Sequence, residues 1–113
     1  SGFKAYLGTT DVREVLKMVD NGDKKAELIY DAFVYQVAKE IGACVAASQG
    51  RAQGIGITGG IAHSKRLTDD LKTYVTTLAD YHVFPGESEM EALAEGFYRV
   101  YDGEEEVLEY PGE

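Results

Sequence analysis

The feature that most constrains the fold is a long segment without proline, which runs from Asp23 to about Ser48 and ends near Gly50. Its apolar residues recur at steps of three and four, which places them on one face of an amphipathic α-helix. These residues are Leu28, Ile29, Ala32, Phe33, Val37, Ile41 and Val45. Glycine costs a helix about 1 kcal/mol relative to alanine. Gly42 therefore predicts that another helix or backbone packs closely at that point.

A shorter helix is predicted before the long one. Asp11 and Glu14 have the spacing of a capping box, in which side chains bond the backbone at a helix start. Apolar residues then follow at helical spacing until the pair Asn21-Gly22 interrupts them. Ahead of this helix, residues 3–8 alternate weakly and end at a glycine, which predicts a short strand or extended segment.

Strands and helices alternate after the long helix. Residues 53–58 form an apolar run that predicts a buried strand, and the pair Gly59-Gly60 ends it. A helical pattern follows over about residues 63–78. A second short strand is predicted over residues 81–84, where a Pro-Gly turn stops it.

The C-terminal part is predicted to be helical and then acidic. Ser88 and Glu91 offer a second capping box for a helix that runs to about Tyr101. The last residues, with Glu104, Glu105, Glu106 and Glu109, indicate a solvated acidic tail. The alternation of elements predicts an α/β fold with few strands and flanking helices. Sheets usually have about five or six strands, so we expect the 113 residues to be part of a larger domain.

Composition excludes several classes of function. A formal net charge of −9 opposes binding to nucleic acid, which rewards clustered Lys and Arg. No apolar run approaches the roughly 20 residues that cross a membrane. Cys44 is the one cysteine of the sequence, so no internal disulfide can form, and we expect a cytoplasmic location and an inert, packed thiol.

The best candidate site is the segment ITGGIAHS, residues 57–64, which places two glycines between a strand and a helix. Open α/β sheets bind ligands at the carboxyl ends of their strands. Glycines there let a nucleotide approach the backbone, although the same pair also makes tight connections in proteins without ligands. The P-loop pattern does not occur, so a nucleotide site would be of another kind than a P-loop.

Three further blocks carry a resemblance to a known family. They are FKAYLGTTDVREV (3–15), YQVAKEIGA (35–43) with ITGGIA (57–62), and FPGESEMEALAEG (84–96). In order and spacing they are similar to the butyrate kinase pattern of the acetate-and-butyrate kinase family, over nearly the whole chain. The resemblance implies part of a ribonuclease-H-like, actin-like ATPase domain, namely its C-terminal nucleotide-binding portion.

The resemblance also implies an activity and its cofactors. Such a kinase transfers the γ-phosphoryl group of ATP to butyrate, giving butyryl phosphate and ADP, and usually runs in the ATP-forming direction with Mg²⁺. The implied nucleotide contacts are Asp11, Val12, Arg13, Gly59, Gly60, Ile61, Ala62 and His63. Related acetate kinases have glycine and glutamate where this chain has Ala62 and His63, so the side chains at these two positions differ from that pattern.

A metal-linked carboxylate is implied in the segment PGESEME. Glu89 is the first choice and Glu87 the second, since Mg²⁺ prefers oxygen ligands. A glutamate at a helix start also has a purely structural explanation, because it meets the positive end of the helix dipole. Arg13 likewise is explained without a ligand as a solvated charge on an exposed helix face.

No catalytic residue is assigned, because the resemblance places the acyl-substrate domain and a glycine-rich phosphate loop before this region. We therefore expect the 113 residues alone to be inactive. Two alternatives stay open: a kinase for branched-chain or other short-chain carboxylates, and a non-catalytic nucleotide-binding or assembly module. The resemblance further implies a homodimer or higher homo-oligomer.

Overall fold

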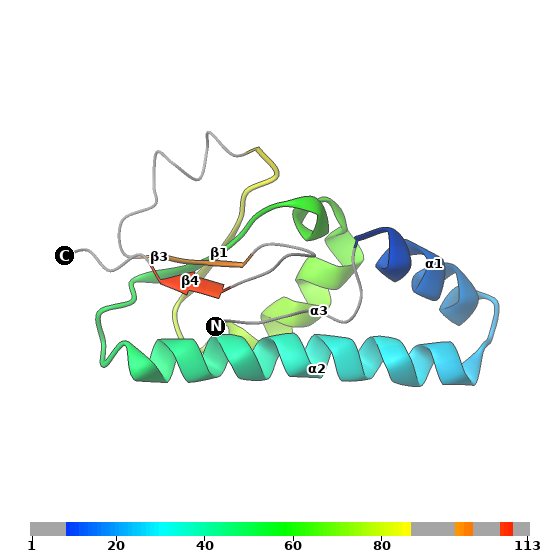
Figure 1. The fold of residues 1–113 in the computed structure, drawn as a ribbon, viewed down its shortest axis with the longest axis horizontal. Coiled ribbons are helices and arrows are strands. Elements are labelled where there is room, and N and C mark those ends of the chain that lie inside the picture. Colours follow the sequence, from blue (N-terminus) through cyan, green and yellow to red (C-terminus); the bar gives the residue numbers. More distant parts are fainter. Residues whose placement is uncertain (1–8, 87–96, 101–106, 110–113) are drawn as a thin grey trace.

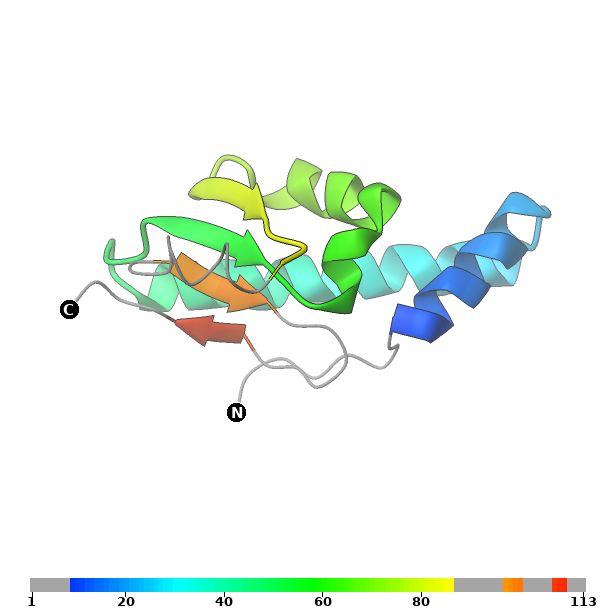
Figure 2. The same ribbon diagram turned by 90° about the horizontal axis from the view of Figure 1, so that it is seen from above.

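The structure is a computed structural model that describes the backbone of residues 9–86, 97–100 and 107–109, and the side chains of residues 12–86. Helices lie on one side of a small sheet in these parts of the chain (Figures 1 and 2). The elements are α1 (Thr9–Asp20), α2 (Lys24–Ala47), β1 (Gly54–Ile57), the 3-10 helix η1 (Gly60–His63), α3 (Lys65–Val75), β2 (Asp80–Val83), β3 (Phe97–Val100) and β4 (Val107–Glu109).

The first two helices form a hairpin. Gly22, with a φ of 91°, provides the turn between them, and Asp23 caps α2 by accepting a 3.0 Å hydrogen bond from the N–H of Ala26. The long helix therefore begins and ends as the periodicity predicts, with Ser48 as its C-cap. At 1.5 Å per residue α2 is about 36 Å long, and it runs beneath the sheet (Figure 1).

The sheet has four strands in the order β2-β1-β3-β4. β1 is central and pairs in parallel with both β2 and β3, whereas β4 is antiparallel to β3. A further hydrogen bond from the N–H of Phe84 to the carbonyl oxygen of Ile57 measures 2.8 Å and extends the β1–β2 pairing. The α/β class is confirmed, with more strands than the two or three that the sequence reveals.

The core forms between β1 and the apolar faces of α2 and α3. All four residues of β1 are buried, and Ile55 and Ile57 are wholly excluded from solvent. Val37 and Ile41 of α2 and Leu71 of α3 complete the same cluster. Fully burying such a side chain contributes about 1.5–3 kcal/mol, so β1 is held from the helical side as well as by its two neighbours.

Three predictions about helix boundaries and the C-terminal part are wrong. α1 begins at Thr9, so Asp11 lies inside its first turn and does not cap it. The helix predicted to reach Tyr101 is contradicted by β3, because Phe97–Val100 pairs with β1 in a sheet. Part of the predicted tail, Val107–Glu109, also belongs to that sheet. The strand predicted over residues 3–8 lies outside the described residues.

The expectation for Gly42 is also wrong. A Cβ atom built there meets the Cδ1 atom of Leu78 at 3.8 Å, which is ordinary van der Waals contact. No backbone in the described part of the chain approaches closely enough to require a glycine. Cys44, by contrast, is half-buried against the core, as expected for a packed thiol.

None of the described helices is long and apolar enough to span a membrane.

The hydroxyl of Tyr30 is expected to make the fold sensitive to alkaline pH. Tyr30 is buried and donates a 2.6 Å hydrogen bond to Asp70, and burial raises the pKa of its hydroxyl. The unfolded chain ionises tyrosine near pH 10 while the folded chain keeps Tyr30 neutral. The free energy of unfolding should therefore fall as pH rises above about 10, and Tyr30→Phe should reduce that fall.

Urea unfolding at pH 7 and at pH 10.5 checks this. At pH 7 the same substitution should cost about 0.5–1.5 kcal/mol through the lost hydrogen bond. Tyr35→Phe on the exposed face of the same helix is the control, and should stay within about 0.5 kcal/mol of wild type at pH 7. An alkaline slope equal to that of wild type in Tyr30→Phe contradicts the prediction.

Gly59 is expected to tolerate no side chain. Its φ of 77° and ψ of −161° lie in a region that essentially only glycine adopts. Gly59→Ala should therefore destabilise the chain by about 1–3 kcal/mol. Gly42→Ala is the matched control, since it should stabilise α2 by about 0.5–1 kcal/mol. Equal thermal midpoints for the two variants would refute the assignment of strain to Gly59.

Candidate nucleotide site

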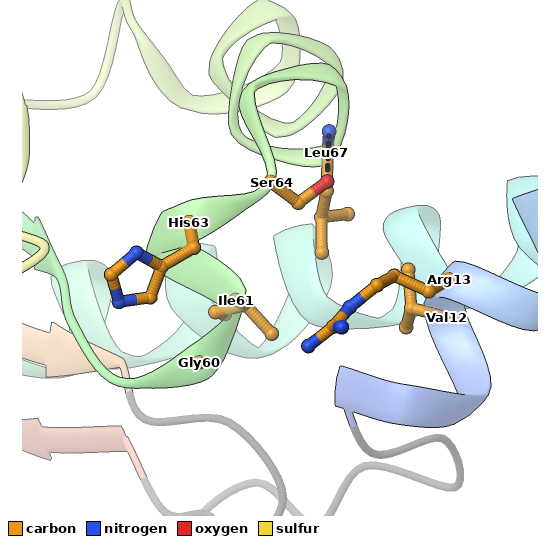
Figure 3. A pocket seen from close by; sticks show the side chains of 7 residues that line it. All are labelled: Val12, Arg13, Gly60, Ile61, His63, Ser64 and Leu67. Atoms are coloured by element: carbon orange, nitrogen blue, oxygen red, sulfur yellow. Dashed lines mark hydrogen bonds between the residues drawn. The ribbon is translucent and has the colours of Figure 1, made fainter.

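A pocket of about 380 Å³ opens where α1 faces η1 and the start of α3 (Figure 3). Its lining residues are Val12, Arg13, Gly60, Ile61, His63, Ser64 and Leu67. Two segments that are far apart in the sequence therefore share one cavity. Its volume lies within the range of about 300–1,000 Å³ that is typical of small-molecule sites.

The walls of the pocket combine an apolar floor with a cationic rim. Val12, Ile61 and Leu67 are buried, so they are fixed by the core. Arg13 is exposed and extends from α1 toward Ile61 (Figure 3). The imidazole of His63, also exposed, points away from Arg13 in the same view. An apolar surface beside an exposed cation suits a ligand with a flat ring and an anionic group.

A second cavity of about 380 Å³ provides a useful contrast. It lies between α2 and α3 and is lined by Tyr30, Asp31, Val34, Asp70, Thr73 and Tyr74. Two carboxylates in its wall repel an anionic ligand, whereas the described residues that line the pocket beside Arg13 include no carboxylate. Of the two cavities, the one beside Arg13 is suited to phosphate even though the net charge is −9.

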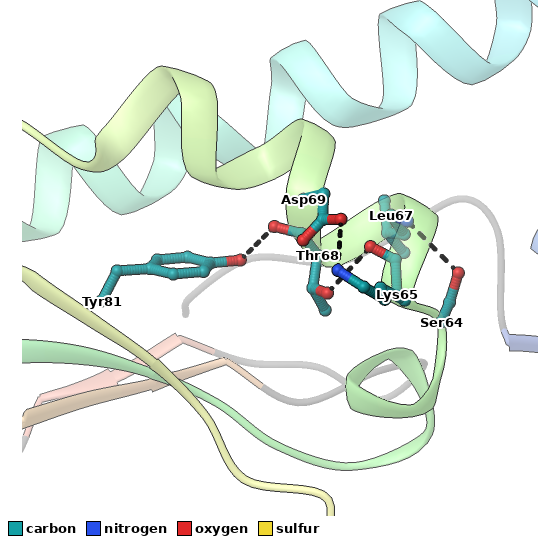
Figure 4. A network of polar contacts seen from close by, with 6 residues as sticks. All are labelled: Ser64, Lys65, Leu67, Thr68, Asp69 and Tyr81. Carbon is teal, nitrogen blue, oxygen red and sulfur yellow. Dashed lines mark hydrogen bonds and ion pairs between the residues drawn. The ribbon is translucent and has the colours of Figure 1, made fainter.

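The turn after β1 shapes one wall of this pocket. The positive φ of Gly59 redirects the chain at the carboxyl end of β1, and η1 follows at once. Ser64 then caps α3 by accepting a 3.3 Å hydrogen bond from the N–H of Leu67 (Figure 4). The strand, glycine pair and helix predicted from the sequence are all present, with η1 inserted before α3.

The structure brings together five of the predicted nucleotide contacts: Val12, Arg13, Gly60, Ile61 and His63. Gly59 and Ala62 do not line the pocket, and Ala62 is buried. Their contribution is to the path of the chain around the pocket. The side chain of Asp11 and all of Glu87 and Glu89 lie outside the described residues.

Sequence reasoning assigned no ligand contact to two lining residues, Ser64 and Leu67, although Ser64 lies within the candidate segment 57–64. Ser64 reads as a helix cap and Leu67 as an ordinary core position, and both are indeed a cap and a core residue. Each lines the pocket only because α3 starts directly after η1. The capping spacing between Ser64 and Leu67 is the signal that would have placed the helix start there.

No group of three or more His, Cys, Asp or Glu side chains converges among the residues that the structure describes. Mg²⁺ commonly binds through one or two carboxylates, water and substrate phosphates, so it does not need such a group. Which carboxylate of this chain would meet the metal stays a prediction, since Glu89 is not described.

Comparison with known proteins supports one family. The model of the acetokinase family matches residues 1–81. Two curated relatives, both called probable butyrate kinase, come from Clostridium botulinum strains Alaska E43 (type E3) and Eklund 17B (type B). Each is 49% identical to this chain over 109 residues, which cover 96% of this chain and 31% of the relative.

The resemblance found in the sequence motifs is thus confirmed over most of the chain, which spans about a third of the length of these relatives. The strand, glycine turn and helix around the pocket lie within the matched residues. The chain belongs to the acetokinase family and forms an α/β part of its actin-like ATPase fold.

Proposed function

We propose that this chain is the C-terminal nucleotide-binding portion of a butyrate kinase, an enzyme that transfers the γ-phosphoryl group of ATP to butyrate. The observation that carries the proposal is the shared pocket, in which Val12 and Arg13 of α1 meet Gly60 and Ile61 beyond β1. The names of the two relatives support the substrate. The reaction gives butyryl phosphate and ADP, is reversible, and is proposed to run mainly toward ATP.

The pocket residues have distinct proposed roles. Gly60 leaves room for the adenosine against the backbone, and the side chain of Ile61 offers an apolar surface to the base. The guanidinium of Arg13 meets the phosphates, where its planar donors match phosphate oxygens. Phosphoryl transfer depends on positioning and charge stabilisation, so this portion supplies the nucleotide's position and one of the required cations.

The remaining requirements are proposed to lie in the parts of the relatives that this chain does not match. These parts would hold the acyl group and complete the phosphate contacts. Mg²⁺ would bridge phosphate oxygens and, in this chain, Glu89. A homodimer or higher homo-oligomer and a cytoplasmic location also stay predictions.

Nucleotide binding is tested by calorimetric titration with Mg·ADP. Wild type should bind, and Gly60→Val should bind at least tenfold more weakly because the valine side chain occupies the space against the backbone. Circular dichroism establishes that the variant is folded. Unchanged affinity in folded Gly60→Val rejects the nucleotide site. No binding by wild type would mean that the unmatched parts of the relatives build the site, or that this chain is a structural scaffold.

Arg13 is tested in the same assay against a matched cation. Arg13→Ala should weaken Mg·ADP binding at least tenfold, since hydrogen bonds to charged groups contribute roughly 1.5–3 kcal/mol. Lys17→Ala is the control: it removes one positive charge from the exposed face of the same helix, outside the pocket lining. Equal losses from both substitutions would indicate a general field effect and not a contact.

The substrate is tested at full length. The 113 residues alone should form no butyryl phosphate from ATP and butyrate, because the acyl site is proposed to lie elsewhere. The full-length protein should prefer butyrate in a panel with acetate, propionate, isobutyrate and isovalerate. Kinases turn over at roughly 1 s⁻¹ or faster. Turnover at such a rate by the 113 residues contradicts the proposal that the acyl site lies elsewhere.

A further inference from the structure

Arg66 connects three helices around the candidate nucleotide site. Its guanidinium lies 2.7 Å from the carboxylate of Asp20, the last residue of α1. It also lies 5.9 Å from the ring centroid of Tyr30 on α2, within the range of a cation–π contact. Arg66 itself belongs to the first turn of α3, directly before Leu67, which lines the pocket.

Tyr30 in turn fixes the aromatic surface that Arg66 meets. Its side chain is buried, and its hydroxyl donates a 2.6 Å hydrogen bond to the carboxylate of Asp70 on α3. The ring is thus anchored at both ends by the core and by α3. Asp20, Arg66, Tyr30 and Asp70 together form a set of contacts, hereafter the clamp, that joins α1, α2 and α3.

The clamp crosses the boundary between the two walls of the pocket. α1 carries Val12 and Arg13, and the segment from η1 to α3 carries the remaining lining residues. A turn at Gly22 follows the C-terminal end of α1. The direction of α1 therefore depends on its packing against α2 and on the ion pair between Asp20 and Arg66. Without that pair α1 can pivot about its buried Val12, and this rotation would shift the neighbouring Arg13 relative to η1 and α3.

We infer that Arg66 and Asp20 are positioning residues for the proposed nucleotide site: their ion pair sets the separation of Arg13 from Gly60 and Ile61. The inference rests on the proposed function. Neither residue lines the pocket, so they act through the placement of α1. The contact is an exposed one, with side-chain exposures of 45% for Arg66 and 64% for Asp20. Its effect is therefore limited.

The expected size of the effect follows from that exposure. Asp20→Asn and Arg66→Ala should each raise the Kd for Mg·ADP two- to fivefold, which is about 0.4–1 kcal/mol at 1.4 kcal/mol per tenfold. Asp20→Asn leaves Arg66 beside Tyr30, so it isolates the ion pair. The double variant Asp20→Arg with Arg66→Asp, which exchanges the two charges, should recover at least half of the affinity for Mg·ADP that the single variants lose.

The chain offers a matched control on the same helix. Lys65 and Asp69 form an ion pair of 2.8 Å within α3 (Figure 4), with an exposed lysine and a comparable geometry. This pair does not reach α1. Lys65→Ala and Asp69→Asn should leave the Kd within 1.5-fold, about 0.25 kcal/mol at 1.4 kcal/mol per tenfold. The comparison separates the placement of α1 from a change of charge near the site.

A second measurement does not depend on nucleotide. Hydrogen exchange of the α1 backbone amides should become faster in Asp20→Asn and Arg66→Ala and stay unchanged in Lys65→Ala. Faster exchange together with weaker binding supports the inference. Unchanged exchange overturns it whether or not nucleotide binds, and so does unchanged Kd in both clamp variants. Absence of Mg·ADP binding by wild type rejects the proposal that these residues bind nucleotide by themselves, and hydrogen exchange then still tests whether the clamp holds α1.

Discussion

Burial of the central strand is the constraint on which the rest of the structure depends. β1 has paired neighbours on both edges and helices against its apolar side chains, so its direction is fixed within the sheet. Both neighbours run parallel to it, and its carboxyl end is where the chain must turn away. The glycine pair lies at that end. The pocket is therefore a consequence of where β1 stops, and its shape is fixed by how α1 and α3 pack around that end.

Local periodicity was enough to predict those helices and strands whose formation does not depend on pairing with a distant segment. The long helix, β1 and β2 all follow from spacing and from turn residues. The strand Phe97–Val100 was not predicted, because a short apolar run fits a helix or a strand equally well. This segment forms a strand because it pairs with β1, which is distant in sequence. The same long-range pairing brings Val107–Glu109 into the sheet, where the acidic composition had indicated a tail.

The candidate site was predictable in its parts and not in its assembly. The glycine pair and the segment around Arg13 were recognisable from pattern and resemblance, but only packing places both on one cavity. Ser64 and Leu67 carry no signal beyond cap and core. Arg66 carries even less, because a surface arginine in a first helical turn is ordinary, and its contacts with Asp20 and Tyr30 exist only in three dimensions.

The two-walled pocket has a consequence for the lifetime of the protein in the cell. Its walls come from segments that meet only when the core is complete, so the unfolded chain has no equivalent site. A ligand held there stabilises the folded state by mass action, by about 2.7 kcal/mol when its concentration is 100 times the Kd. Proteases act on the opened chain. If the pocket binds nucleotide as proposed, abundant nucleotide would protect the protein from degradation, and depletion of nucleotide would shorten its survival.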